Sequence, residues 1–121
     1  MSEHLFRHSQ PQPGLHVVEL ILPMSIDHTE FDKLNDVVGD LLDGPPARER
    51  WVLDLKQVDY IGSAMLGLLV NLRQRVKAGG GRLVLCGLSE HIHKALKTCS
   101  LQSLIIITDQ RDSAIRRAVA S

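Results

Sequence analysis

The sequence contains few aromatic residues and carries no net charge. Aromatic side chains make up 3% of its 121 residues, and 14 lysines and arginines are balanced by 14 aspartates and glutamates. Proteins that bind single-stranded nucleic acid combine a basic groove with aromatic rings on which bases stack, and surfaces that bind polyanions carry an excess of basic residues. Because the composition shows neither feature, nucleic acid is not an expected partner.

Cysteine is also scarce, and long apolar runs are absent. Cys86 and Cys99 are the only cysteines and form no Cys-x-x-Cys pair, so both are expected to be buried free thiols. No apolar run approaches the roughly 20 residues that a membrane-spanning helix requires, and no secretory leader is evident. The sequence therefore predicts a soluble cytoplasmic protein without direct membrane insertion.

The length and the order of apolar segments indicate a single α/β domain over residues 1–121. Short apolar runs typical of strands alternate with segments whose apolar residues recur at helical spacing. This alternation predicts a mixed sheet of four or five strands, with an N-terminal hairpin strand and about four helices packed mainly on one face. The expected strands are 15–22, 51–61, 83–86 and 104–107, the expected helices begin at Asp27, Ser63, Ser89 and Asp109 or Asp112, and 9–14 is an expected loop.

The most informative segment runs from Trp51 to Lys77. Its first part is an apolar run typical of a strand that is buried on both faces. Gly62 interrupts this run, and Ser63 is placed to cap the helix that follows, which Gly79 to Gly81 end with a left-handed cap. The N-terminus of a helix favours an anion, and a serine that caps it can be phosphorylated. We therefore expect this turn to be functional.

Several short motifs follow one another along nearly the whole chain. They are Ile26-Asp27 at the start of the first helix, Val52 to Leu55, Val58 to Ile61, Ser63 to Leu69, Gly80 to Ser89, and Leu101 before the last strand. Their order and spacing together resemble the STAS domain, the family of bacterial anti-sigma factor antagonists. The resemblance implies a protein that binds a partner protein without turning over a substrate. Neither enzyme activity nor a cofactor is therefore expected.

The resemblance breaks down at the turn before the second helix. In the STAS family this turn usually reads Asp-Ser-Ser-Gly or Asp-Ser-Thr-Gly, and its second hydroxyl residue is phosphorylated by a partner kinase. Here the four positions are Gly62, Ser63, Ala64 and Met65, so the acidic residue and the usual phosphoacceptor are both missing. Ser63 is the remaining phosphorylation candidate, but a shift of one position rotates a helical side chain by about 100°. Met65 replaces the family's glycine and either packs in the first turn or contacts a partner.

The resemblance implies a signalling function in transcription regulation. In classical members the unphosphorylated form binds an anti-sigma factor, an ATPase with a histidine-kinase fold, and phosphate on the turn weakens binding. This chain is therefore expected to be anti-sigma factor antagonist-like but without the phosphoserine switch. The expected partner-binding residues are Met24, Ser25, Asp27, Gly62, Ser63, Ala64, Met65, Gly67, Gly87 and Ser89.

Two alternatives stay open at this point, because each would use the same face of the same fold. One is a STAS subunit of an ABC transporter for lipids, and the other is a STAS scaffold component of a stress-signalling complex. The first predicts a nucleotide-binding subunit as the partner, and the second predicts large oligomers. The sequence leaves the oligomeric state open.

Histidines and Cys86 offer other candidate sites, which the sequence argues against. His4 and His8 are four positions apart, but their segment is not helical, and His91 and His93 would point to nearly opposite sides of a helix. No metal site is therefore expected. Cys86 precedes a helix N-terminus that would lower a thiol pKa, but no histidine is placed to act as its base.

Overall fold

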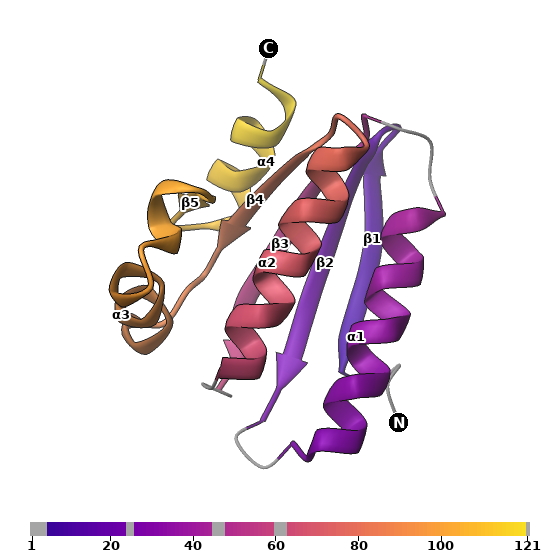
Figure 1. Cartoon of the computed structure of the whole chain (residues 1–121). Helices are drawn as coiled ribbons and strands as arrows, with labels where there is room; N and C mark the ends of the chain where they lie inside the picture. Colours follow the sequence, from indigo (N-terminus) through magenta and orange to yellow (C-terminus); the bar gives the residue numbers. More distant parts are fainter. Residues whose placement is uncertain (1–4, 24–25, 45–47, 60–62, 121) are drawn as a thin grey trace.

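Five strands form one sheet in their order along the chain, β1-β2-β3-β4-β5 (Figure 1). The computed structural model describes residues 5–23, 26–44, 48–59 and 63–120. The strands are β1 (Phe6–Gln12), β2 (Leu15–Leu22), β3 (Arg50–Val58), β4 (Arg82–Cys86) and β5 (Ile106–Thr108). β1 pairs antiparallel with β2 as a hairpin, and the pairs from β2 to β5 are parallel. The predicted mixed sheet is confirmed.

Four α-helices cover the two faces of this sheet unequally. They are α1 (His28–Asp43), α2 (Ser63–Ala78), α3 (Glu90–Thr98) and α4 (Arg111–Val119), and a short 3₁₀ helix, η2 (Leu101–Ser103), follows α3. α1, α2 and α3 each connect two parallel strands and bury their apolar residues in the larger core cluster. α4 packs through Ala114 and Ala118 against the other face. Figure 1 shows α1 and α2 across the first of these faces, which we call the α1/α2 face, and we call the other the α4 face.

Alternation along the strands divides the apolar side chains between the two faces. In β2, Val18, Leu20 and Leu22 join the core under α1 and α2. Leu15 and Val17 lie under α4 with Val52, Val84 and Cys86. Because both faces are covered here, the first part of β3 is buried almost without interruption, as its apolar sequence predicts.

The helix boundaries follow from local capping. The Asp27 side chain accepts a hydrogen bond from the Glu30 N–H at 2.8 Å, and the Ser89 hydroxyl accepts one from the Ile92 N–H at 3.2 Å. These two predicted N-caps are confirmed, and each satisfies an N–H group that the helix leaves unpaired. The third predicted cap, Ser63, is the first residue of α2, and its side chain lies outside the described residues. Gly80, with φ +76°, has the predicted left-handed conformation after α2. The last helix begins after Gln110, and not after either of the two predicted aspartates.

The predicted loop at 9–14 is wrong for 9–12, because β1 continues to Gln12, and is confirmed for the turn at Pro13 and Gly14. Proline lacks an N–H group and is tolerated on an edge strand, where one side of the backbone has no partner strand. The pairing register of β1 and β2 shifts between Ser9 and Gln12, around Pro11. The sheet therefore accommodates Pro11 by an irregularity at its edge.

Two further predictions need correction near the C-terminal part of the sheet. The last strand is Ile106–Thr108 and not 104–107, and Leu104 is 52% exposed before it. Cys99 is exposed at the C-terminal end of α3, whereas Cys86 is buried in β4. The prediction of two buried thiols is therefore wrong for Cys99, because this residue lies beyond the apolar stripe of its helix.

Candidate functional site

The candidate site lies where three adjacent parallel strands end. β2, β3 and β4 lie side by side, and the loops that follow them lead into α1, α2 and α3. Since the carboxyl ends of parallel strands meet at one edge of a sheet, the ends of β2, β3 and β4 lie at the same edge, toward the bottom of Figure 1. We call these strand ends, together with the described residues that follow them up to the first turns of α1, α2 and α3, the docking edge.

The docking edge carries most of the residues that the sequence analysis selected. Asp27 is exposed and caps α1, and Ser89 caps α3. Met24, Ser25, Gly62 and the Ser63 side chain lie outside the described residues. The described candidates thus lie after the ends of adjacent strands and at helix starts.

The first turns of α2 combine buried and exposed positions. The Ala64 side chain is partly buried and packs against the larger core cluster. Met65 is 1% exposed. Of its two predicted roles, packing in the first turn and contact with a partner, the structure shows packing. Gly67 is exposed, and a Cβ atom built on it would meet no atom within 4 Å. Gly67 therefore marks an open surface one turn into α2.

Gly87 fills a different role from the other candidates, because it packs against β3. Its φ of +70° lies in the left-handed region that favours glycine. A Cβ atom on Gly87 would lie 3.0 Å from both Asp54 Oδ1 and the backbone nitrogen of Lys56. The absence of a side chain therefore allows the end of β4 to approach β3 closely.

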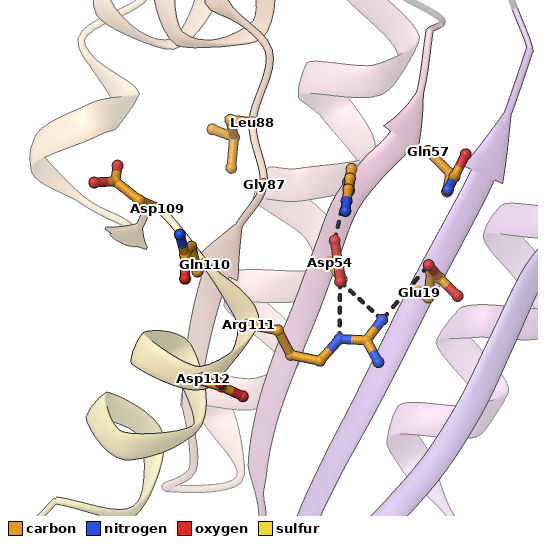
Figure 2. Close-up of a pocket in the computed structure, with 10 residues that line it drawn as sticks. Glu19, Asp54, Gln57, Gly87, Leu88, Asp109, Gln110, Arg111 and Asp112 are labelled. Atoms are coloured by element: carbon orange, nitrogen blue, oxygen red, sulfur yellow. Dashed lines mark hydrogen bonds and ion pairs between the residues drawn. The ribbon is translucent and has the colours of Figure 1, made fainter.

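A cavity of about 600 Å³ opens beside Gly87, on the α4 face (Figure 2). Its walls come from β2, β3, the loop after β4 and the start of α4. It is lined by Glu19, Asp54, Lys56, Gln57, Gly87, Leu88, Asp109, Gln110, Arg111 and Asp112. The sequence analysis predicted Gly87 but none of the charged residues of this cavity.

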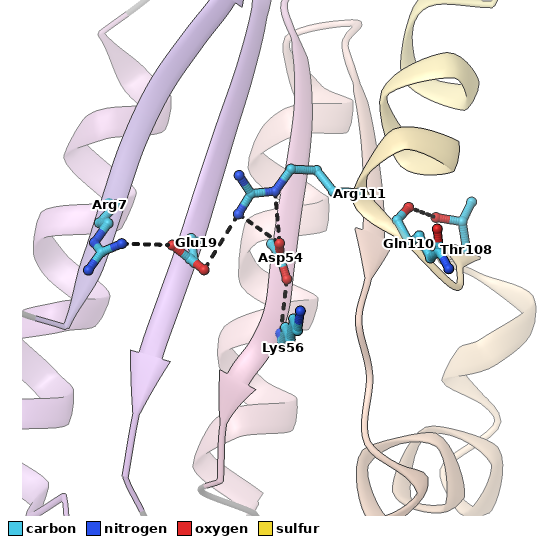
Figure 3. Close-up of polar contacts among 7 residues, drawn as sticks. All are labelled: Arg7, Glu19, Asp54, Lys56, Thr108, Gln110 and Arg111. Carbon is cyan, nitrogen blue, oxygen red and sulfur yellow. Dashed lines mark hydrogen bonds and ion pairs between the residues drawn. The ribbon is translucent and has the colours of Figure 1, made fainter.

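An ion-pair network forms the floor of the cavity (Figure 3). The Arg111 Nε and Nη2 atoms lie 2.9 Å and 2.8 Å from Asp54 Oδ2, and Nη2 lies 3.5 Å from Glu19 Oε2. Asp54 Oδ1 accepts a hydrogen bond from the Lys56 N–H at 2.9 Å. At the outer end, Arg7 lies 3.7 Å from Glu19. The network thereby connects α4 to three strands.

The electrostatics of this network are governed by the burial of Asp54, which is 4% exposed. A buried carboxylate needs hydrogen bonds and an opposite charge to compensate for the loss of water. Burial alone would lower the pKa of Arg111, but the hydrogen bond to Asp54 and the charges of Asp54 and Glu19 outweigh it, so the pKa is raised. Arg111 therefore remains a cation paired with Asp54.

A signal for this network exists in the sequence. Asp54 is the only charged residue between Trp51 and Leu55, in a run that is otherwise apolar. Aspartate is rarely buried without a partner, so the run predicts a cation nearby. The sequence does not say which one, because Arg111 is 57 residues away along the chain.

Cys86 lies next to this network and is fully buried. Burial raises the pKa of the Cys86 thiol to about 12, and the charge of Asp54 adds to this effect while Arg111 opposes it. A thiol kept protonated in this way is a poor nucleophile. The argument against a catalytic Cys86 is thus strengthened.

Other site classes can be considered only within the described part of the chain. There, no group of three or more His, Cys, Asp or Glu side chains is arranged to hold a metal ion. Among the same residues, no helix has the length and apolar character needed to cross a membrane.

The sequential five-stranded sheet, the N-terminal hairpin and the helices on both faces define an α/β domain of STAS architecture. The STAS domain family model matches residues 10–114 of the chain. The protein therefore belongs to the STAS domain family, and the resemblance seen in the sequence is confirmed. Family members that are anti-sigma factor antagonists are regulatory binding proteins.

Individual relatives agree with this assignment. BtrV of Bordetella bronchiseptica, described as a candidate anti-sigma factor antagonist, is 32% identical over 65 residues. This match covers 54% of the chain and 56% of BtrV, and so spans about half the length of that relative.

Two solved structures are similar over almost the whole chain. A protein of Thermotoga maritima described as a candidate anti-sigma factor antagonist has a TM-score of 0.77 at 22% identity, and the match covers 98% of both chains. An anti-sigma-factor antagonist (STAS) domain protein of Planctomyces limnophilus has a TM-score of 0.80 at 19% identity, covering 95% of this chain and 98% of the other. At these identities the two structures establish the fold alone.

Proposed function

We propose that this protein is an anti-sigma factor antagonist-like STAS module that binds a partner protein through the docking edge without a phosphoserine switch. The observation that carries the proposal is the residue at the phosphoacceptor position, Ala64, whose side chain packs against the core. Membership of the STAS family and the similarity to BtrV support the binding function.

The absence of the switch follows from the chemistry of the docking edge. Phosphorylation adds about 1.5 to 2 negative charges at neutral pH, which is how phosphate on a docking surface repels a partner. Ala64 has no hydroxyl group to accept phosphate. Ser63 has one, but it lies one position earlier, about 100° around the helix axis from the acceptor position. We infer that the module is permanently competent to bind, or is controlled by other means.

The partner is inferred from the family. The first candidate is an anti-sigma factor with a histidine-kinase-like ATPase fold. Affinity capture of the tagged chain from its own cells, followed by mass spectrometry, tests this inference. The same experiment examines the tryptic peptide Gln57–Arg73, which contains Ser63.

We expect an ATPase of this fold to co-purify and the peptide to be unmodified. Recovery of transporter subunits, or of STAS proteins alone, would contradict the antagonist function. A phosphate on Ser63 that weakens partner binding would contradict the absence of a switch while leaving the docking edge intact.

Gly67 allows a sharper test of the docking edge. Because a side chain at this position enters open space, Gly67→Arg should fold normally and weaken binding of the captured partner by about tenfold or more, equivalent to about 1.4 kcal/mol. Ala78→Arg is the matched control, since it adds the same side chain to an exposed position at the other end of α2.

A second substitution at Gly67 distinguishes the effect of a large side chain on binding from the effect of losing glycine on helix stability. Gly67→Ala should preserve binding and stabilise the domain by about 0.5–1 kcal/mol, because alanine favours a helix over glycine. Equal affinities of the Gly67→Arg and Ala78→Arg proteins, measured by calorimetry, would place the partner on another surface.

A further inference from the structure

A stack of three rings lies on the α1/α2 face, at the amino ends of β2 and β3 and so away from the docking edge. His8 of β1 and His16 of β2 stack with centroids 5.1 Å apart, and His16 stacks on Trp51 of β3 at 4.2 Å. The planes of the two pairs differ by 16° and 14°. His16 and Trp51 are each 4% exposed, so His16 is a titratable group enclosed between an edge strand and the core.

The two histidines belong to one chain of hydrogen bonds. His16 Nε2 lies 3.1 Å from Glu49 Oε1, and His16 Nδ1 lies 2.9 Å from His8 Nε2. A carboxylate only accepts hydrogen bonds, so His16 donates to Glu49 through Nε2–H. In neutral His16 the Nδ1 atom then carries the lone pair, and it accepts from His8 Nε2–H. Glu49 thereby sets the tautomers of both rings.

Proton counting shows that this arrangement accepts one extra proton but not two. The first proton can reside on His8 Nδ1, or on His16 with His8 as the acceptor, and the bond between the rings is kept in either case. A second proton leaves no lone pair between His8 Nε2 and His16 Nδ1. It would place two N–H groups of two imidazolium ions 2.9 Å apart, where like charges repel.

The surrounding charges do not relieve this repulsion. Glu49, before β3, is the carboxylate in contact with the pair. Arg7 and Glu19, on β1 and β2, pair with each other at 3.7 Å by the α4 face. Asp43 of α1 and Arg75 of α2, on the helices that cover the α1/α2 face, pair with each other at 2.7 Å. Among the described residues, Glu49 is therefore the single carboxylate that faces the two histidines, each of which can become a cation.

We propose that the His8–His16 pair is a pH-sensitive clasp that holds the edge strand β1 on β2 and releases it when both imidazoles are protonated. The other contacts of β1 lie mainly at its start, where Phe6 to Ser9 pair regularly with β2 and Phe6 packs against the larger core cluster. Beyond His8 the ladder is irregular between Ser9 and Gln12. The ion pair of β1 to Glu19 involves an Arg7 side chain that is 77% exposed, and such pairs contribute little. Release would free the β1-facing edge of β2, which could then pair with another strand.

The direction of the pH dependence follows from His8. Its pKa is lowered below the ordinary 6.5, first by burial and then by the charge of His16. The released strand therefore binds more protons than the closed one, so acid favours release. The closed form is favoured above pH 6.5, and it loses this preference as the pH falls from there toward the lowered pKa.

Trp51 provides the test, because it is the only tryptophan of the chain and its ring stacks on His16. The emission of Trp51 and the hydrogen exchange of β1 amides, corrected for intrinsic exchange, are measured in the intact chain between pH 8 and 5. We expect the emission to change reversibly below pH 6.5. The protection of β1 amides should fall about tenfold relative to β3 amides, equivalent to about 1.4 kcal/mol.

His8→Gln should abolish both changes, because glutamine can donate a hydrogen bond but does not titrate. His91→Gln, at an exposed position of α3, is the matched control and should behave like the wild type. The clasp is refuted if the hydrogen-exchange protection of β1 amides changes in parallel with that of β3 amides at every pH. It is also refuted if the Trp51 emission and β1 protection of His8→Gln change with pH as they do in the wild type.

A measurement on the wild type keeps the proposal testable even if His8→Gln misfolds. The ring NMR signals of His8 should titrate below the ordinary pKa of 6.5. A titration of His8 at or above the ordinary pKa of 6.5 would overturn the proposal.

Discussion

Replacement of Arg111 by methionine removes the cation that compensates the Asp54 carboxylate. Methionine keeps most of the apolar stem of arginine, so the substitution isolates the loss of charge and hydrogen bonds. The Asp54 side chain is 6% exposed, whereas that of Arg111 is 42% exposed. The carboxylate would remain buried, with the Lys56 N–H as its remaining donor in the network.

The magnitude lies between two limits. Removal of one partner from a fully buried ion pair costs about 3–5 kcal/mol, whereas an exposed pair contributes about 0–1 kcal/mol. Since Arg111 is partly exposed and the cavity admits water to its side of Asp54, we expect Arg111→Met to lower the free energy of unfolding by about 2–3 kcal/mol. With a urea m-value of about 1–3 kcal/mol/M for a domain of this size, the unfolding midpoint should fall by about 0.7–3 M.

Urea unfolding followed by circular dichroism measures this change. Arg116→Met is the control, because Arg116 is an exposed residue of the same helix whose replacement should alter stability by less than about 0.5 kcal/mol. Asp54→Asn removes the negative charge. In a protein that already carries Asp54→Asn, Arg111→Met should lower the free energy of unfolding by at least about 1 kcal/mol less than it does in the wild type. The electrostatic argument is refuted if Arg111→Met and Arg116→Met unfold at the same urea concentration.

Two further predictions concern the residues around Asp54. Gly87→Ala should destabilise the domain by about 1–3 kcal/mol in the same assay, because alanine is strained at positive φ and its Cβ would lie 3.0 Å from Asp54 Oδ1; a neutral effect would contradict the close approach of β4 to β3. In the folded protein one thiol, Cys99, should react rapidly with a disulfide reagent at pH 8, whereas Cys86 should react only after unfolding, since it is buried and its pKa is raised to about 12. Rapid reaction of both thiols would contradict this assignment.

The features that the sequence predicted correctly are those that depend on neighbours along the chain. Asp27 and Ser89 cap their helices as predicted because a cap joins residues only three positions apart. The common edge for the loops after β2, β3 and β4 was also predictable, because it follows from parallel strands alone. The occupants of that edge could be chosen from the family motif, but their contacts could not.

The features that the sequence did not predict depend on pairing between distant segments. The partner of Asp54 is set by the packing of α4 on β3, which no periodicity encodes. The spacing of the histidines suggests a pair of His8 with His4 and not with His16, because the hairpin register that joins His8 to His16 continues through the segment predicted as a loop. In both cases the sequence contained the residues but not the register that brings them together.

The position of α4 has a consequence for the order in which the domain can become complete. Each strand pairs with the strand synthesised before it, so the sheet can grow in the direction of synthesis. The α4 face is covered only after α4 has been synthesised. Arg111 follows Asp54 by 57 residues, so Asp54 is synthesised long before its cation. A nascent chain that stops before α4 would leave the apolar residues under that helix open to water and a carboxylate in their midst without its cation. The domain therefore reaches its full stability only after α4 has been synthesised and has packed on the sheet.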